Sequence, residues 1–227
     1  MKTKTKLIVG IAVAVIIGLF AYNKMNAEEL SGNFSLGYNS DFSFRGVDAG
    51  TSATQAGIGL ETDVFGVGVG LDASVNIKDA GEDEVRLSAS TSVDVLDSVT
   101  TSVGVVTYDN NHAIGDDTEL FIALGAEIIL SPGVKLFYNP NENHITTEGS
   151  ISHAVSITEE IAVEAIGSVG HTNIGGDWGI YYGLDVVAGY SVSDNTQFYV
   201  GVLTRNLQDI NLEEPDVSFV AGLNHSF

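Results

Sequence analysis

From residue 34 onward, apolar side chains fall on alternate positions of the chain and almost nowhere at helical spacing. A strand points successive side chains to opposite faces, so such alternation predicts strands with one apolar and one polar face. The sequence therefore predicts an all-β protein of twelve strands, at residues 34–44, 56–64, 67–77, 85–95, 99–105, 120–130, 134–138, 145–157, 161–169, 178–192, 198–202 and 217–227.

The connections between these runs alternate in length. Short turns are expected at 65–66, 96–98, 131–133, 158–160 and 193–195, and longer polar loops at 47–52, 78–84, 109–117, 139–144, 173–177 and 206–215. Across two of the short turns, Val95 should face Val99 and Val192 should face Thr196. Periplasmic turns alternating with extracellular loops are typical of outer-membrane barrels. We predict one domain, a 12-stranded antiparallel up-and-down transmembrane β-barrel.

A soluble β-sandwich, which also alternates, is the competing interpretation. Closing the sheet removes its exposed edges, which favours the barrel. Phe227 lies on the apolar parity and resembles the C-terminal aromatic signal read by the outer-membrane assembly machinery, an expected partner. Aromatic residues of the apolar parity gather near strand ends, as in the interfacial girdles of a membrane barrel: Phe34, Tyr190, Phe198 and Phe227 at the turn side, and Phe42, Phe44, Tyr138, Trp178 and Tyr182 at the loop side.

The N-terminal residues differ from the rest of the chain. Lys2, Lys4 and Lys6 precede an uninterrupted apolar run over 7–21, as in a secretory signal peptide. That run is shorter than the ~20 residues of a membrane-spanning helix. Cleavage after Ala27 is expected, although Met25 fits the usual small-residue pattern poorly, so an uncleaved anchor is the alternative. We expect a signal peptide at 1–27 and an outer-membrane β-barrel at 28–227.

Charge narrows the possible functions. The chain carries 9 basic and 30 acidic side chains, a net charge of −21, and no cysteine. This charge repels phosphate backbones and excludes nucleic acid as a partner. The absence of cysteine excludes disulfides, thiolate zinc sites and thiol catalysis.

The side chains at the inward-facing positions of the predicted strands are small and polar, so we expect water in the lumen. The excess of acidic side chains there predicts a porin-like channel for passive diffusion of small hydrophilic solutes, with a preference for cations. The charged residues predicted to line the lumen are Asp41, Glu61, Asp72, Asp94, Glu119, Glu127, Glu148, Glu164 and Asp185, with Arg45, Arg86, Lys135 and Arg205.

Other interpretations of these charges remain open. They could pair across a narrow, filled lumen. The three arginines are expected together at the loop end, either to select an oxyanion or to pair with Glu119 and Asp41. The barrel could also be a closed structural or receptor protein whose acidic loops bind a surface partner.

The segment Ser40-Asp41-Phe42-Ser43-Phe44-Arg45-Gly46-Val47, followed by Gln55-Ala56-Gly57, resembles the opening of the Gcw_chp family, also called TorF-type porins. Members typically begin, after a signal peptide, with Ser-Asp-Tyr-x-Phe-Arg-Gly, so Phe42 replaces the usual Tyr. The resemblance implies an outer-membrane barrel with porin-like transport and carries over Asp41 and Arg45. The family is common in marine bacteria and their phages, which suggests placement of a phage-encoded porin in a host outer membrane.

An outer-membrane phospholipase, with Ser and His at the lipid face, is the rival class. His153, His171 and His225 have the outward parity, but pairing Ile157 with Ile161 sets Thr147 opposite His171 and Ala165 opposite His153. The first two histidines are then far apart along the sheet, so we expect no catalytic triad, no enzyme activity and no cofactor.

The outward positions of the eighth and ninth strands, at 145–157 and 161–169, are the least lipid-like. Besides the histidines they include Thr147, Gly149 and Gly167, and polar groups facing hydrocarbon are costly. These strands therefore predict a homo-oligomer contact. The acidic loop residues at 79–84 and 116–117 match no calcium-binding loop, so we expect no protein metal site and expect these side chains to be solvated by water. The alternative is that divalent cations bridge these acids to lipopolysaccharide.

Overall fold

The structure is a computed structural model that describes residues 30–41, 43–44, 47–48, 52–79, 83–110, 117–174, 177–208 and 216–227. The expected signal peptide at 1–27 lies outside these ranges, as do Phe42 and Arg45. Within the ranges, no helix is long and apolar enough to cross a membrane.

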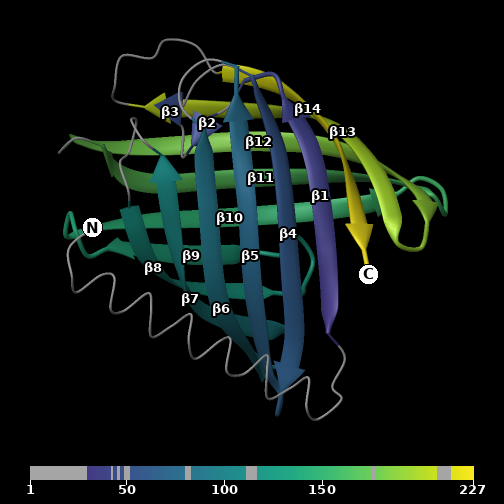
Figure 1. The fold of residues 1–227 in the computed structure, drawn as a ribbon, viewed down its shortest axis with the longest axis horizontal. Helices are drawn as coiled ribbons and strands as arrows, with labels where there is room; N and C mark the ends of the chain where they lie inside the picture. The colour runs from purple at the N-terminus through teal and green to yellow at the C-terminus, as the bar shows by residue number, and fades with distance from the viewer. Residues whose placement is uncertain are drawn as a thin grey trace.

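The strands close into a single antiparallel barrel in which each strand pairs with its neighbours along the chain and β1 meets β14, as Figure 1 shows. The predicted twelve-stranded, up-and-down barrel is confirmed. Its strands are β1 (Ser31–Asn39), β4 (Ala53–Val64), β5 (Val67–Lys78), β6 (Glu84–Leu96), β7 (Val99–Asn110), β8 (Asp117–Ala126), β9 (Gly133–Asn139), β10 (His144–Ser156), β11 (Ile161–Ile174), β12 (Asp177–Ser193), β13 (Thr196–Gln208) and β14 (Asp216–Ser226).

The alternate apolar residues of the strands form the outer wall of the barrel. In β12, Ile180, Leu184 and Val186 point outward and are 44%, 52% and 43% exposed, whereas inward-pointing Tyr181 is 2% exposed. Water would disfavour so large an exposed apolar surface, but lipid tails solvate it. The outer wall is therefore suited to a bilayer.

One end of the barrel carries the hairpin turns that join β4 to β5, β6 to β7, β8 to β9, β10 to β11 and β12 to β13; we call it the turn end and the opposite end the loop end. The β4–β5 turn consists of Phe65 and Gly66, which both have positive φ, 57° and 79°. That geometry matches the right-handed twist of the flanking strands. The Asp63 carboxylate accepts a hydrogen bond of 2.8 Å from the Gly66 amide and fixes the turn.

Two hairpins differ from the predicted pairing by one residue. Val95 was expected opposite Val99, but Leu96 pairs with Val99. In the same way Ser193, and not Val192, pairs with Thr196. A β-bulge precedes each turn and inserts an extra residue into one strand, which shifts the register locally.

Two strand ends also differ from the prediction. The first barrel strand stops at Asn39, and the next residues form a separate two-stranded sheet of β2 (Ser43–Phe44) with β3 (Val47–Asp48). The sixth predicted strand, β8, ends at Ala126 rather than at Leu130. Leu130 and Ser131 have positive φ, 70° and 30°, so the backbone turns although the alternation of apolar residues continues.

The barrel closes between its first and last strands. Gly37 of β1 pairs with Gly222 of β14, and Gly222 pairs on its other side with Tyr199 of β13. A Cβ at Gly37 would lie 2.5 Å from the Tyr199 hydroxyl, and a Cβ at Gly222 would overlap the same group. The Tyr199 side chain therefore reaches across both glycines at the closing seam.

Candidate functional site in the barrel lumen

The interior holds a cavity of about 680 Å³, the central cavity. Serine hydroxyls line it, including those of Ser88, Ser102 and Ser168. Because serines and ionic groups hydrogen-bond to water, the cavity is suited to hydrated solutes. Six charged residues predicted for the lumen surround this one space: Asp72, Arg86, Lys135, Glu148, Asp185 and Arg205.

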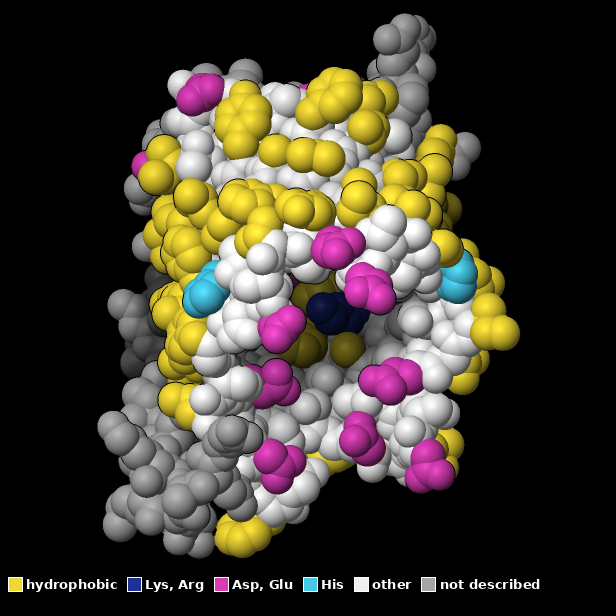
Figure 2. All heavy atoms as spheres, turned by 90° about the vertical axis from the view of Figure 1, so that its right-hand side faces the viewer, with side chains coloured by type: hydrophobic (Ala, Val, Ile, Leu, Met, Phe, Trp, Pro, Cys, Tyr) yellow, Lys and Arg dark blue, Asp and Glu magenta, His cyan; other side chains and the backbone are white. Residues whose placement is uncertain are grey.

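A second cavity, of about 420 Å³, adjoins the first toward the turn end and shares Asp72, Ser90 and Ser102 with it. Glu61 and Asp72 are its charged residues. Figure 2 looks from the right-hand side of Figure 1 into the barrel: acidic side chains surround the opening and a basic side chain lies deeper inside. The turn-end mouth is thus acidic, and the basic groups lie behind it.

Inward-facing aromatic rings occupy part of the lumen, which sequence analysis missed. Phe121, Phe137 and Tyr181 line the central cavity. Tyr181 lies over Gly170, where an added Cβ would overlap its ring, and Phe121 similarly covers Gly104. Gly104 and Gly170 therefore accommodate rings rather than widening the lumen. Recording aromatic residues on both parities of β8, β9 and β12 would have revealed them.

A two-pronged ionic contact joins β12 to β13. Arg205 donates two hydrogen bonds to Asp185, Nη1 to Oδ1 and Nη2 to Oδ2, the latter 2.8 Å long. Nη1 also donates to the Thr204 carbonyl at 2.8 Å. A two-pronged contact of this kind holds both side chains in place and neutralises their charges locally. Asp185 and Arg205 therefore add little net charge to the lumen.

The other cationic side chains of the central cavity rest on aromatic rings. Lys135 Nζ lies 5.6 Å from the ring centre of Phe121 and 5.9 Å from that of Phe137. The Arg86 guanidinium lies 5.1 Å from the Tyr108 ring centre. Cations at these distances are attracted to the negative face of a ring.

Two carboxylates receive tyrosine hydrogen bonds. The Tyr181 hydroxyl donates to Glu148 at 2.6 Å, and the Tyr108 hydroxyl donates to Glu119 at 3.3 Å. Near the loop end, the Asn76 side-chain amide donates to Glu84 at 3.0 Å, and both are buried. The sequence predicts Glu84 in a loop, because the first apolar residue of the run is Val85. In the structure β6 begins one residue earlier, at Glu84.

The remaining predicted lumen residues lie outside the central cavity. Asp94 is near the turn end and accepts a 2.6 Å hydrogen bond from Thr100, while Glu164 lies on β11, paired with Ala154 and Val187. Asp41 lies two residues after the end of β1, and Glu127 directly follows the last residue of β8. These two lie beyond the strand ends because the strands are shorter than predicted. Arg45 lies outside the described residues.

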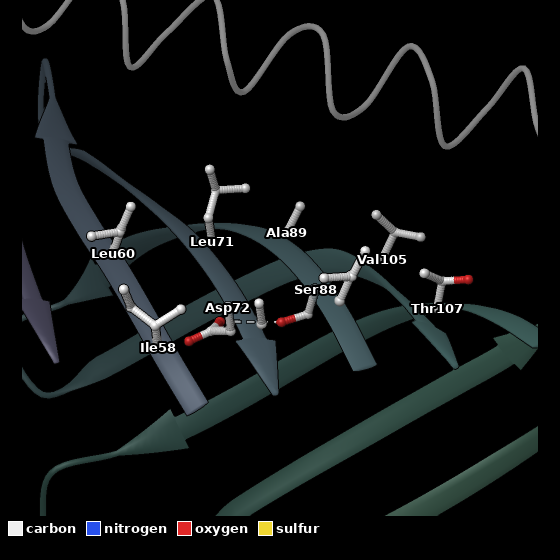
Figure 3. Close-up of a pocket in the computed structure, with 10 residues that line it drawn as sticks. Ile58, Leu60, Leu71, Asp72, Ser88, Ala89, Val105 and Thr107 are labelled. Carbon is white, nitrogen blue, oxygen red and sulfur yellow. Dashed lines mark hydrogen bonds between the residues drawn. The ribbon is translucent and has the colours of Figure 1, made fainter. Parts of the chain in front are cut away.

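The outer wall of β4–β7 has a shallow apolar cavity of about 270 Å³. Figure 3 shows Leu60, Leu71, Ala89 and Val105 on one side of the sheet and Asp72 on the other, where it accepts a 3.1 Å hydrogen bond from Ser88. Adjacent residues on β5 thus face lipid and lumen in turn.

The outward histidines are placed as predicted: Thr147 pairs with His171, and His153 with Ala165. His171 lies six positions along β11 from Ala165, the partner of His153, so the two imidazoles lie on different levels of β10–β11. Among the described residues, no group of three or more His, Asp or Glu side chains could hold a metal ion.

Neither the protein-family comparison nor the search of curated proteins finds a match to this chain. Solved structures do match in fold. The NanC porin aligns over 86% of this chain and 98% of its own at 10% identity, with a TM-score of 0.55. An outer-membrane channel from Pseudomonas putida F1 aligns over 88% and 96% at 8% identity, with a TM-score of 0.57.

Outer membrane phospholipase A from Escherichia coli also aligns, over 86% of this chain and 95% of its own at 10% identity, with a TM-score of 0.50. The fold is therefore that of the outer-membrane β-barrels, a class that includes channels and an enzyme. A structural match at such low sequence identity establishes the fold alone. Function depends on the site that the fold carries.

Proposed function

We propose that this protein is a porin-like outer-membrane channel through which small hydrophilic solutes diffuse passively. The observation that supports the proposal is the pair of adjoining cavities inside a closed barrel, lined by serine hydroxyls and charged side chains and enclosed by an apolar outer wall. Hydrated solutes require such an inner surface, and a bilayer requires such an outer one.

Placement in the outer membrane of a Gram-negative cell is part of this proposal, with residues 1–27 as a cleaved signal and 28–227 as the barrel. Phe227 lies on the outer wall, where its ring would meet a Cβ added at Gly32, and its backbone exchanges two 2.9 Å hydrogen bonds with Gly32. An outward terminal aromatic supports recognition by the outer-membrane assembly machinery. Lipopolysaccharide would contact the loop end.

The acidic turn-end mouth supports a preference for cations. Glu61 and Asp72 line the inner cavity there, and carboxylates around a narrow opening raise the local concentration of cations. Asp185 contributes less than the sequence suggested, because Arg205 holds its carboxylate.

The double variant Glu61→Gln/Asp72→Asn is expected to lower the ratio of cation to anion permeability by about two- to fivefold, the range that weak, screened charge interactions support. Reversal potentials in planar bilayers across a KCl gradient measure this ratio. Glu159→Gln is the matched control, because Glu159 is an exposed residue of the β10–β11 turn and lines neither lumen cavity. An unchanged ratio in the double variant would reject the mouth as the filter.

A closed receptor or structural barrel is the second candidate, favoured by the rings of Phe121, Tyr181 and Phe137 that occupy part of the lumen. The loops expected to bind a surface partner lie largely outside the described residues. Purified wild-type protein that inserts into bilayers without producing discrete conductance steps would reject the channel and favour this candidate.

We further propose kinship with the Gcw_chp porins. The supporting observations are the segment from Ser40 to Val47 and a porin-like fold. Asp41 is the described residue that this kinship carries over; it lies beside the loop end of β1, where its amide donates a hydrogen bond to Asn39 Oδ1 at 3.3 Å. A gene carried by a phage would place the same barrel in the host outer membrane.

We also propose that a second copy of the chain contacts β10 and β11, whose outward face includes His153, Thr147 and His171. Because the chain has no cysteine, single cysteines report contacts directly. His153→Cys is expected to form disulfide-linked dimers in membranes, and Ile58→Cys, on the outer wall of β4, is not. Equal cross-linking at both positions would contradict a specific contact.

A further inference from the structure

The central cavity places a cationic and an anionic side chain on adjacent strands without joining them. Lys135 of β9 and Glu148 of β10 are direct cross-strand partners and both line the cavity. Opposite charges at such positions usually attract one another. Here Lys135 contacts two aromatic rings and Glu148 accepts a hydrogen bond from a tyrosine. Both charged groups therefore remain available to a ligand in the cavity.

The Lys135 ammonium turns toward Phe121 and Phe137 instead of toward a carboxylate. Among the described residues, these ring contacts are its only interactions, and its side chain is exposed to the cavity. An ammonium resting on rings still has hydrogen-bond donors available, because a ring face accepts the charge without accepting its hydrogens in the way a carboxylate does.

The Glu148 carboxylate is held from the opposite side. The Tyr181 hydroxyl donates to its Oε2 at 2.6 Å, and Tyr181 itself is 2% exposed and fixed over Gly170. A carboxylate has two oxygens and can accept several hydrogen bonds, so this contact leaves acceptor capacity facing the cavity. Tyrosine thus orients the carboxylate without neutralising it.

Apolar surface lies beside these two charges. Phe121, Phe137, Val106 and Ile166 line the same cavity. A solute that contacted them would need an apolar part in addition to charged groups, since burying a polar group against these side chains without a hydrogen bond is unfavourable.

We propose that the central cavity is a binding site for small zwitterions with an apolar side chain, the chemical class of the neutral amino acids. The solute carboxylate pairs with Lys135, its ammonium pairs with Glu148, and its side chain contacts the rings of Phe121 and Phe137. This assignment rests on the proposed channel function and specifies the solute class for that channel.

The charge distribution along the lumen supports the same solute class. On the path between the turn-end mouth and the central cavity, an anion is repelled at Glu61 and Asp72, and a cation is repelled at Lys135. A zwitterion has no net charge to be repelled at either place and satisfies both groups of the central cavity.

The test measures swelling of proteoliposomes containing the full-length protein, with L-valine as the zwitterionic probe and erythritol as an uncharged solute of similar size. Wild-type protein is expected to admit L-valine about two- to fivefold faster than erythritol, the range expected for weak ionic contacts in a wet site. Lys135→Gln and Glu148→Gln are each expected to bring the ratio of the two rates to about one. Lys135→Arg, which keeps the charge, is expected to preserve the preference.

The matched control is Glu159→Gln, which removes a charge from an exposed residue of the β10–β11 turn that lines neither lumen cavity. Erythritol rates report whether each variant forms a folded pore, so a folding defect is distinguished from a lost binding contact. Equal wild-type rates for the two solutes would overturn the zwitterion site while leaving the channel intact. A loss of preference in Lys135→Gln alone would show a carboxylate site and overturn the zwitterion assignment. No swelling with either solute would overturn the channel itself.

Discussion

Replacing Gly222 with valine is expected to open the barrel at its closing seam. An added Cβ at this inward position would overlap the backbone carbonyl of Leu36 on β1 and the Tyr199 hydroxyl. A side chain could move away, but the Leu36 carbonyl belongs to the strand that pairs with β14, so the two strands must separate. We expect a loss of about 1–3 kcal/mol or more in the free energy of unfolding, as for overpacked sites.

Thermal unfolding followed by the β-sheet circular dichroism signal in detergent measures this loss. Gly125→Val is the matched control, because Gly125 is also a strand glycine of the barrel but nothing lies within 4 Å of a Cβ added there. Equal stability of the two variants would contradict the proposed importance of the seam. The comparison separates the clash from the general effect of placing valine in a strand.

Arg205→Ala is expected to destabilise the barrel and to increase its preference for cations. The Asp185 side chain is 13% exposed and would lose both hydrogen bonds from the guanidinium. Hydrogen bonds to charged groups contribute about 1.5–3 kcal/mol each at most, and water in the lumen reduces the loss, so we expect about 1–3 kcal/mol. The released carboxylate would add one negative charge to the central cavity, which reversal potentials would detect.

A double-mutant cycle isolates this pair. Asp185→Asn/Arg205→Ala removes both charges and is expected to recover part of the stability lost in Arg205→Ala, since no uncompensated charge is left. Arg205→Lys keeps the charge but cannot reproduce the two-pronged contact, so an intermediate stability is expected. Additive effects of the single changes would show that the two side chains do not stabilise one another.

Much of the fold followed from the alternation of side chains. Apolar residues at every second position of β12, from Ile180 to Val192, were enough to define both faces of that strand. The pairing of Thr147 with His171 followed from a single expected hairpin, because antiparallel register propagates along two strands once one pair is fixed. Prediction failed at strand ends, where backbone conformation at Leu130 and the bulges before two turns overrode the apolar pattern.

The site was only partly predictable for a different reason. The odd or even position of a residue along its strand decides whether the side chain faces the lumen or the outside. Asp72, Lys135 and Glu148 were predicted to face the lumen in this way, and they line the central cavity. This position does not decide which partner each side chain meets. Phe121 and Tyr181 have the inward parity of β8 and β12; the Phe121 ring contacts the Lys135 ammonium, and the Tyr181 hydroxyl donates a hydrogen bond to the Glu148 carboxylate.

The sequence by itself determined the strands, their order and the apolar outer wall, because these depend on local alternation and on connections between neighbouring runs. The register of the closing seam, the Arg205–Asp185 contact and the separation of Lys135 from Glu148 were decided only by the tertiary structure. The physical reason is that closing the barrel brings rings and ionic groups from different strands into one small space, where sterics and hydrogen-bond geometry select among pairings that residue spacing leaves open.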